Sequence, residues 1–413
     1  MWRSGGRGGR RAALIGAIVG AGAPAASSWH DARVVPEPMP AAFETLAAEL
    51  RELLPDRSGV LDAHTHLGLD EDGQSLTLES LLAFLDQVDP GASACVFALH
   101  DPDRRPAYRR PNDRVLEWAA QADGRLFPFC RLDPAEDPVA EGERCLALGA
   151  RGIKLHPRAQ SFGFAQPAAS AIFELAAQAG VPILIHAGRG MGRMDDLADL
   201  ALRHPDAALV LAHAGIADQA MFATRLADHP AVVYDTSCFS AYDVIELFAR
   251  VPAERIVFAS DVPYGRPVGG LYQTMRVASY AGLDQRERAM IAGETMSALL
   301  EGRPLPAVSA PRVAEIRRSS GRLTRVGAYL LMGFGAAMGA GPPPDPARQL
   351  PMIAMARAAC RDPDPGPAGP VLERIDGLLA AAQEIATAGG EHAFTAFGLL
   401  MAAGSIAATE IFD

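Results

Sequence analysis

The sequence predicts an α/β protein whose main part is a (β/α)8 TIM barrel, followed by a small C-terminal all-α domain. Two observations carry this prediction. From residue 59 onwards, short apolar segments alternate with amphipathic segments, a pattern typical of parallel strands joined by helical crossovers. The chain holds eight such strand-plus-helix units, which is the number in a barrel of this class.

The strands are expected at residues 59–63, 94–99, 126–131, 152–156, 182–186, 208–213, 232–236 and 255–260. Amphipathic helices are expected between them, for example at residues 76–88, 113–122, 168–179 and 241–249. A doubly wound open sheet is the alternative fold. It lacks support, because no G-x-G-x-x-G phosphate loop follows the first strand.

The character of the chain changes after the last of these units. Residues 36–303 are therefore assigned to the barrel, and residues 304–413 to a helical C-terminal domain whose role the sequence does not indicate. This second region is rich in Ala, Gly and Leu. Its helices are expected at residues 325–340, 350–359, 371–388 and 393–412.

Residues 1–35 are set apart as a signal-like or disordered N-terminal segment. Arg10 and Arg11 precede a short apolar run at residues 12–22, the layout of a twin-arginine-like export signal. A disordered tail or an over-long gene start explains the same residues. We expect a cytoplasmic protein, with export as the alternative if residues 1–25 are a true signal.

Composition and charge exclude several kinds of partner. The 413-residue chain has a formal net charge of -11, which argues against a nucleic-acid surface, because phosphate binding needs clustered positive charge. The five cysteines show no C-x-x-C spacing and are expected to be free thiols in a reducing compartment. We expect a small-molecule substrate, no membrane association and a homo-oligomer as a candidate assembly.

Ionisable side chains gather at the ends of the predicted strands. In chain order they are His64, His66, Lys154, His156, His186, His213 and Asp261. The carboxyl ends of barrel strands converge on one mouth, so these residues are expected to meet there. Taken singly, each histidine is equally well explained as an ordinary core or capping residue. Their joint placement predicts a metal site.

The D-A-H-T-H segment supports this prediction. Alternate residues of a strand share a face, so His64 and His66 can both place imidazole nitrogens on one ion. Asp62 has the same parity and is expected to orient one of these ligands.

Lys154 is the only lysine in the chain. A buried lysine can lose its proton, act as a nucleophile or take up CO2, whereas arginine stays charged. Retention of this one lysine therefore indicates a chemical role at residue 154. The alternative is a chance survivor in a chain from which a GC-rich genome removed lysine.

Five segments in this order resemble the amidohydrolase superfamily, and most closely its amidohydrolase-related (amidohydrolase 2) branch. They are L-D-A-H-T-H-L-G, G-I-K-L-H-P, P-I-L-I-H-A-G, L-V-L-A-H-A-G and I-V-F-A-S-D-V-P-Y-G. The resemblance covers residues 59 to about 302. It implies a metal-dependent barrel enzyme but leaves the substrate open, because the branch includes hydrolases, lactonases, decarboxylases and hydratases.

The resemblance also implies roles for individual residues. His64, His66 and His186 would be metal ligands, and Asp261 a further ligand or the proton acceptor for a metal-bound water. His213 would polarise the substrate or hold that water. Neutral imidazoles with a carboxylate suit one Zn2+, although Mn2+, Fe2+ and Co2+ fit the same ligands.

Lys154 is the position at which branches of the superfamily diverge. In two-metal members a carboxylated lysine bridges the ions, so two ions are expected if Lys154 is carboxylated. In the one-metal branch its ammonium would hold a substrate carboxylate or stabilise an oxyanion. His156, with the same inward parity, and Arg189, on a glycine-rich loop, are further candidate substrate contacts.

Three functions are compatible with these residues. The first is a metal-dependent hydrolase acting with a metal-activated water on a C–O or C–N bond of a small amide, lactone or ester. The second is a metal-dependent decarboxylase of a small carboxylic acid at the same site. The third is a metal-free lyase that uses Lys154 as a Schiff-base amine, and it leaves the histidines unexplained.

Overall fold

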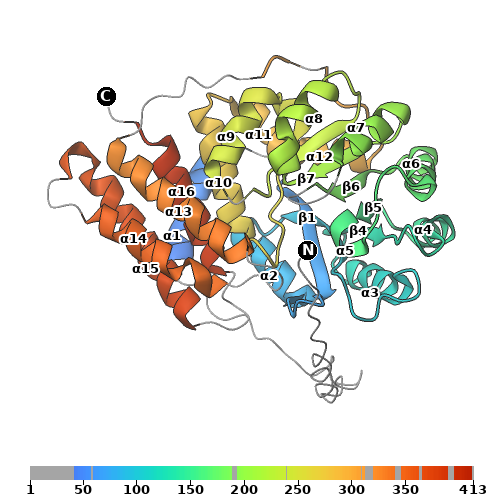
Figure 1. Cartoon of the computed structure of the whole chain (residues 1–413), viewed down its shortest axis with the longest axis horizontal. Coiled ribbons are helices and arrows are strands. Elements are labelled where there is room, and N and C mark those ends of the chain that lie inside the picture. The colour runs from blue at the N-terminus through green and yellow to red at the C-terminus, as the bar shows by residue number, and fades with distance from the viewer. Residues whose placement is uncertain are drawn as a thin grey trace, which may run out of the picture. The chain divides into compact units, whose positions relative to one another are not determined.

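A single mixed sheet organises the computed structural model, and its strands follow one another in the order β2-β1-β3-β4-β5-β6-β7-β8-β9 (Figure 1). The described residues are 41–56, 59–187, 193–238, 240–307, 309–311, 320–339, 346–361, 365–388 and 395–411. Their strands are β1 (Leu61–Leu69), β2 (Ser75–Leu76), β3 (Ser93–Ala98), β4 (Leu126–Arg131), β5 (Gly152–Leu155), β6 (Ile183–His186), β7 (Leu209–Ala212), β8 (Val232–Asp235) and β9 (Ile256–Val257).

All eight predicted strands are present and parallel, whereas β2 was not predicted and pairs antiparallel with β1. The sheet curls until β1 meets the segment after β9. Asp261 N–H donates to His64 O at 2.9 Å, and His66 N–H donates to Val262 O at 3.0 Å. Strand order therefore follows chain order without the reversal that a doubly wound sheet requires, so the alternative fold is wrong.

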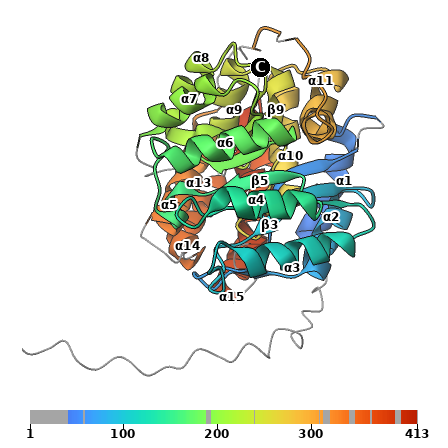
Figure 2. The ribbon, with the colours of Figure 1, turned by 90° about the vertical axis from the view of Figure 1, so that its right-hand side faces the viewer.

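Helices surround the curled sheet, as Figure 2 shows for α3, α4, α6, α7 and α8. In chain order the helices up to residue 300 are α1 (Ala41–Leu53), α2 (Leu78–Val88), α3 (Arg109–Ala120), α4 (Pro138–Ala147), α5 (Pro157–Gln160), α6 (Pro167–Ala179), α7 (Met194–Arg203), α8 (Gln219–Arg225), α9 (Ala241–Arg250), α10 (Pro267–Tyr280), α11 (Gln285–Ala289) and α12 (Thr295–Leu300). Local sequence sets several of their starts. The Ser240 hydroxyl, for example, caps α9 by accepting a hydrogen bond from Tyr242 N–H.

The inner face of the curled sheet is apolar. One cluster of side chains fills the inside of the curled sheet and includes Phe129, Leu184, Val233 and Val257. Side chains alternate along a strand, so the residue two positions after each of the first three also faces the interior. These residues, at the carboxyl ends of β4, β6 and β8, are Arg131, His186 and Asp235. The strands therefore bring charged and imidazole groups together above an apolar floor.

The C-terminal helices are α13 (Gly321–Gly339), α14 (Leu350–Cys360), α15 (Gly369–Ala388) and α16 (Thr395–Thr409), close to the predicted ranges. Figure 1 shows them beside α1 and α10, and α16 packs on α10. Their buried side chains belong to the same apolar cluster as the helices around the sheet. Arg266, just before α10, donates to the hydroxyl of Thr395 at 2.7 Å. The domain boundary at residue 304 stays a prediction.

The crossing of α10 and α16 depends on glycine. A Cβ atom at Gly269 would lie 2.5 Å from the Cα atom of Gly398 and 2.6 Å from its carbonyl oxygen. Both obstacles are backbone atoms, so Gly269→Ala is expected to force the helices apart and lower the free energy of unfolding by about 1–3 kcal/mol. Urea denaturation measures this loss.

Gly377→Ala is the matched control. Gly377 lies on α15, and no atom lies within 4 Å of a Cβ built there. Alanine in an exposed helix interior is expected to raise the free energy of unfolding by about 0.5–1 kcal/mol. A Gly269→Ala protein as stable as the unaltered chain would show that the helices do not cross this closely.

Two further expectations concern the N-terminal segment and membrane association. The signal-like segment at residues 1–35 lies outside the described residues. Within the described helices, none combines the length and apolar character needed to cross a membrane.

Candidate metal centre

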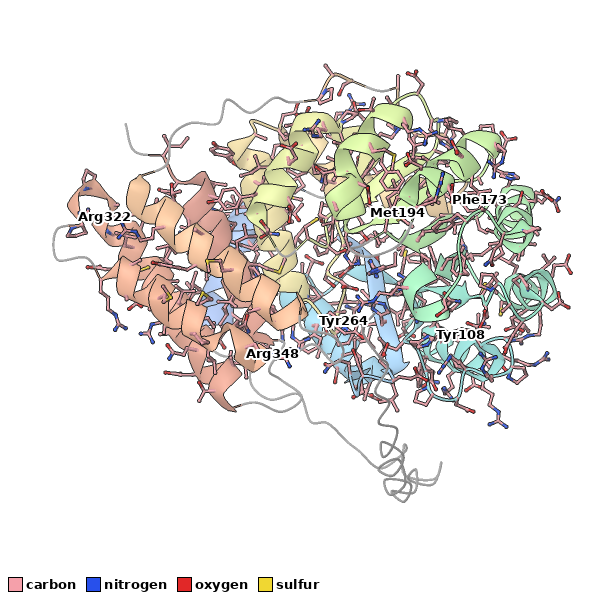
Figure 3. The ribbon with its side chains drawn as sticks, in the orientation of Figure 1. Tyr108, Phe173, Met194, Tyr264, Arg322 and Arg348 are labelled. Atoms are coloured by element: carbon pink, nitrogen blue, oxygen red, sulfur yellow. The ribbon has the colours of Figure 1, made fainter. Side chains whose placement is uncertain are left out.

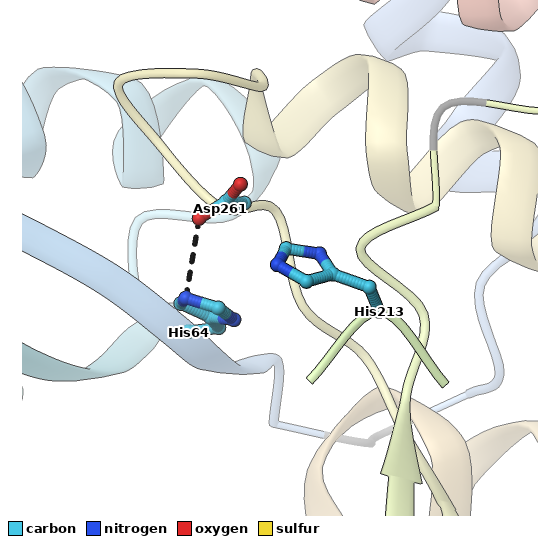
Figure 4. A group of neighbouring side chains, drawn as sticks. All are labelled: His64, His213 and Asp261. Atoms are coloured by element: carbon cyan, nitrogen blue, oxygen red, sulfur yellow. Dashed lines mark ion pairs between the residues drawn. The ribbon is translucent and has the colours of Figure 1, made fainter. Parts of the chain in front are cut away.

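Three side chains from distant parts of the sequence form the centre of the site (Figure 4). His64 lies on β1, His213 directly follows β7, and Asp261 lies in the segment after β9. One ligand atom from each of the three lies within 4.8 Å of the others, and all three residues are buried. His64 Nε2 lies 3.1 Å from Asp261 Oδ1. This group has the size and chemistry to hold a metal ion.

Two of these residues have a backbone conformation that is uncommon outside glycine. The φ angle is 56° at His213 and 58° at Asp261, both in the left-handed region. Each residue follows the end of a parallel strand, so the left-handed turn sets the direction of its side chain. The surrounding hydrogen bonds hold both turns. His213 N–H donates to Asp235 Oδ1 at 2.7 Å, and Asp261 N–H donates to His64 O at 2.9 Å.

The histidine rings are oriented by hydrogen bonds at Nδ1. The oxygens that face Nδ1 are Asp235 Oδ2 for His64 (2.9 Å), Val262 O for His66 (3.1 Å) and Ser237 O for His213 (2.9 Å). A carbonyl or carboxylate oxygen only accepts, so in each neutral ring Nδ1 carries the proton and Nε2 keeps its lone pair. Imidazoles that hold Nδ1 in this way leave Nε2 as the lone-pair atom, and imidazole nitrogens beside a carboxylate suit a divalent transition-metal ion.

The remaining predicted ligands lie around this group. His66 Nδ1 lies 3.8 Å from Asp261 Oδ1, and His186 Nδ1 lies 3.0 Å from His213 Nε2. The ring of His156 stacks on that of His186, with centroids 3.8 Å apart. The predicted residues thus share one site. The closest group contains His213 in addition to His64 and Asp261, and the division between metal ligands and substrate contacts stays a prediction.

Lys154 is fully buried beside this group. Its Nζ lies 3.2 Å from His64 Nε2 and 4.4 Å from the centre of the Phe97 ring. Burial lowers the pKa of the Lys154 ammonium, while the negative charge of Asp261 acts in the opposite direction. A partly deprotonated amine next to a candidate ligand is compatible with a substrate contact and with a carboxylated bridge.

Burial also controls the ionisation of the other groups. It lowers the pKa of His64, His66 and His186 well below the usual value, so these rings are neutral near pH 7 and can donate a lone pair to a metal. Burial raises the pKa of Asp261, which makes its carboxylate a better proton acceptor than an exposed one.

Asp62 has a different role from the one predicted. A register shift in β1 lies between Asp62 and Thr65 and interrupts the strand's alternation. Asp62 Oδ1 accepts hydrogen bonds from the backbone N–H groups of His64 (3.1 Å) and Ser260 (2.9 Å), so it joins two backbone segments and orients no imidazole. The carboxylate that contacts the His64 ring is Asp235.

The buried Asp62 predicts a pH effect on stability. Burial raises the pKa of its carboxyl from 3.8 to about 7, although the hydrogen bonds from Ser260 and His64 oppose this shift. Because the folded state holds this proton more tightly than the unfolded state, the contribution of Asp62 to stability is fully present below pH 3.8. It is lost as the pH rises through about 7. Asp62→Asn cannot ionise and should escape the loss.

The expected gain of Asp62→Asn relative to the unaltered protein, between pH 4 and pH 7.5, is on the order of 3 kcal/mol. Urea unfolding of both metal-depleted proteins at several pH values measures it. Parallel stability curves for the two proteins would contradict the raised pKa.

Two further residues of the site were missed by the sequence analysis. Asp235 is completely buried at the end of β8 and contacts both His64 and the backbone of His213. Arg131 is buried at the end of β4, is paired with Lys154 in the sheet, and has no hydrogen-bond partner for Nε among the described residues. Both residues could have been found from the sequence, because each is an ionisable residue at the end of a predicted strand. The same rule identified the other site residues. Arg189 lies outside the described residues.

Comparison with known proteins places the chain in a family. The amidohydrolase family model of the amidohydrolase 2 branch matches residues 62–300, which is more than half of the chain. The protein belongs to this family and is an enzyme of the amidohydrolase superfamily. Members of the family are usually metal-dependent, in agreement with the buried His64, His213 and Asp261 group. A search of curated protein sequences finds no match.

Similar solved structures include three enzymes. IDCase from Metarhizium anisopliae, in apo form, is 16% identical, covers 60% of this chain and 98% of its own, and has a TM-score of 0.47. A dihydroxybenzoic acid decarboxylase from a Polaromonas species, with bound manganese and the inhibitor 2-nitroresorcinol, is 16% identical, with coverages of 59% and 97% and a TM-score of 0.46. A probable 2-pyrone-4,6-dicarboxylic acid hydrolase from Acinetobacter baumannii, with citric acid bound, is 14% identical, with coverages of 59% and 99% and a TM-score of 0.46.

Proposed function

We propose that the protein is a metal-dependent hydrolase acting on a C–O or C–N bond of a small amide, lactone or ester. The observation that carries this proposal is the buried group of His64, His213 and Asp261, whose ligand atoms lie within 4.8 Å of one another. A buried carboxylate beside imidazoles has the donor set of a zinc site, and Mn2+, Fe2+ or Co2+ would suit it too.

Each residue has a part in this proposal. His64, His66 and His186 would hold one Zn2+ together with Asp261, and His213 would polarise the substrate carbonyl. A bound divalent ion would lower the pKa of a water molecule towards about 7 and polarise a carbonyl. Asp261 would take up the proton of such a water at Oδ1, because burial raises the pKa of its carboxyl, and would later return the proton to the leaving group.

Lys154 holds the substrate in this proposal. Lys154 and Arg131 are neighbours in the β4–β5 register and are both buried. The Arg131 guanidinium, together with Lys154 in its protonated form, would stabilise an anion, so the substrate carries a carboxylate or develops an oxyanion near them. His156, stacked on His186, and Arg189 are further proposed substrate contacts. If Lys154 is carboxylated instead, the site holds two ions.

The same pair of cations favours a second candidate function. A metal-dependent decarboxylase needs a site that holds the carboxylate of its substrate, and Arg131 with Lys154 would provide one. Both functions use the same residues. Only the products of turnover separate them.

The experiment compares metal-depleted protein with protein reloaded with Zn2+, Mn2+ or Co2+. Panels of esters and lactones are assayed by proton release, a panel of amides by amine release, and a panel of small carboxylic acids by CO2 release. The hydrolase proposal expects metal-dependent release of protons or amine without CO2. Release of CO2 would establish the decarboxylase instead. Turnover without metal, with borohydride trapping of substrate on Lys154, would overturn both and support a Schiff-base lyase.

A further inference from the structure

Asp235 is a carboxylate that contacts elements of the site on two sides. It ends β8, is completely buried, and points into the interior of the sheet with Val233. Its oxygens accept hydrogen bonds from His213 N (2.7 Å), Ser237 N (3.0 Å), Ser237 Oγ (2.6 Å) and His64 Nδ1 (2.9 Å). This network joins the end of β8 to β1 and to the turn after β7.

The two oxygens of Asp235 have separate tasks. Oδ1 accepts from the backbone of His213, which has the left-handed φ angle of 56°, and from Ser237, whose oxygens face His213 Nδ1. Oδ2 faces only His64 Nδ1 in these contacts. The carboxylate therefore holds a ring nitrogen on one side and a strained backbone turn on the other.

The contact with His64 has a chemical consequence. A carboxylate oxygen cannot donate, so Nδ1 of the neutral His64 ring donates to Asp235, and the lone pair on Nε2 faces Lys154 Nζ, which can donate to it, at 3.2 Å. Nε2 is the atom that faces Asp261 Oδ1 at 3.1 Å. Without an acceptor at Nδ1, the ring would be free to place its proton on Nε2 and lose its ligand atom on that side.

We propose that Asp235 is a positioning residue that sets the tautomer of His64, so that this ring presents Nε2 to a cation, and that it also holds the turn of His213. The proposal rests on the proposed metal dependence for its consequence, but the His64 tautomer can be measured without metal. A carboxylate that merely filled space or joined two strands would have no effect on which ring nitrogen is protonated.

Asp235→Asn separates these roles. Asparagine has the same shape, and its carbonyl oxygen can still accept from His213 and Ser237. Its amide nitrogen donates, however, so His64 Nδ1 must become the acceptor and the proton moves to Nε2. Ser237→Ala is the matched local control, because it removes the hydroxyl but keeps the Asp235–His64 contact. Asp376→Asn, on α15, controls for the loss of a carboxylate.

The experiment uses the full chain after metal depletion, with 15N-labelled histidine. Long-range 1H–15N spectra report the tautomer of each ring, and His64→Ala assigns the His64 signals. The Nδ1–H form of His64 is expected in the unaltered protein and in Ser237→Ala, and the Nε2–H form in Asp235→Asn. Zn2+ affinity is expected to fall about 10- to 100-fold in Asp235→Asn and to stay unchanged in Asp376→Asn.

Several outcomes would overturn the proposal. An Nε2–H tautomer of His64 in the unaltered protein contradicts it directly, even if Asp235→Asn does not fold. So does an Nδ1–H tautomer in a folded Asp235→Asn protein, or Zn2+ affinity there within twofold of the unaltered value. If the unaltered protein shows the expected tautomer but binds no Zn2+, Mn2+ or Co2+, the proposed function fails while the tautomer assignment stands.

Discussion

His64→Ala is expected to remove bound metal and to lower kcat/KM by at least about 10^3-fold on any substrate that the unaltered protein turns over. His64 contributes the nitrogen nearest to Asp261 in the candidate metal centre, at 3.1 Å from Oδ1. Activation of water and carbonyl by a metal contributes several kcal/mol to transition-state stabilisation, and each factor of ten in rate corresponds to about 1.4 kcal/mol. Elemental analysis and steady-state kinetics measure the two effects.

His204→Ala is the matched control for this experiment. His204 lies at the end of α7, where Nε2 contacts the hydroxyl of Ser170 at 2.8 Å, on the outer helical layer. Metal content and kcat/KM are expected to stay close to those of the unaltered protein. Equal activity of His64→Ala and the unaltered protein would refute the metal mechanism.

Asp261→Asn is expected to lower kcat/KM by about 10^2- to 10^4-fold, the usual contribution of a general base. Asparagine retains the shape of the side chain but cannot take up a proton at Oδ1. Metal analysis of the same variant separates the two proposed roles of Asp261. Retained metal with lost activity would assign it as the proton acceptor, and lost metal would assign it as a ligand. Full activity with full metal content would exclude both roles.

Much of the fold was predictable because parallel strands that are covered on both faces are continuous apolar runs. Segments such as Ile183–His186 and Leu209–Ala212 were predicted almost to the residue. The first strand was predicted to end at residue 63, because D-A-H-T-H-L-G-L is too polar to resemble a buried strand. In the structure it runs from Leu61 to Leu69. These polar side chains lie on a strand because they line the site. The tertiary structure outweighs local propensity there.

Asp235 and Arg131 show the limit of sequence patterns. An acid or an arginine at the end of a strand is equally typical of a capping residue, and spacing within one strand cannot identify a partner 171 residues away, as Asp235 and His64 are. Asp62 gives the opposite case. Its parity with His64 suggested a contact with the ring, but the register shift in β1 places its oxygen on backbone N–H groups.

The sequence by itself determined the class of fold, the family, and which ionisable residues lie at the mouth of the curled sheet. These follow from apolar periodicity and from residue types at strand ends, which are local properties of the chain. Only the tertiary structure decided that His64, His213 and Asp261 form the closest group and that Asp235 contacts the His64 ring. The physical reason is that ring orientation and tautomer depend on hydrogen-bond partners a few ångströms away in space, and these partners come from other strands.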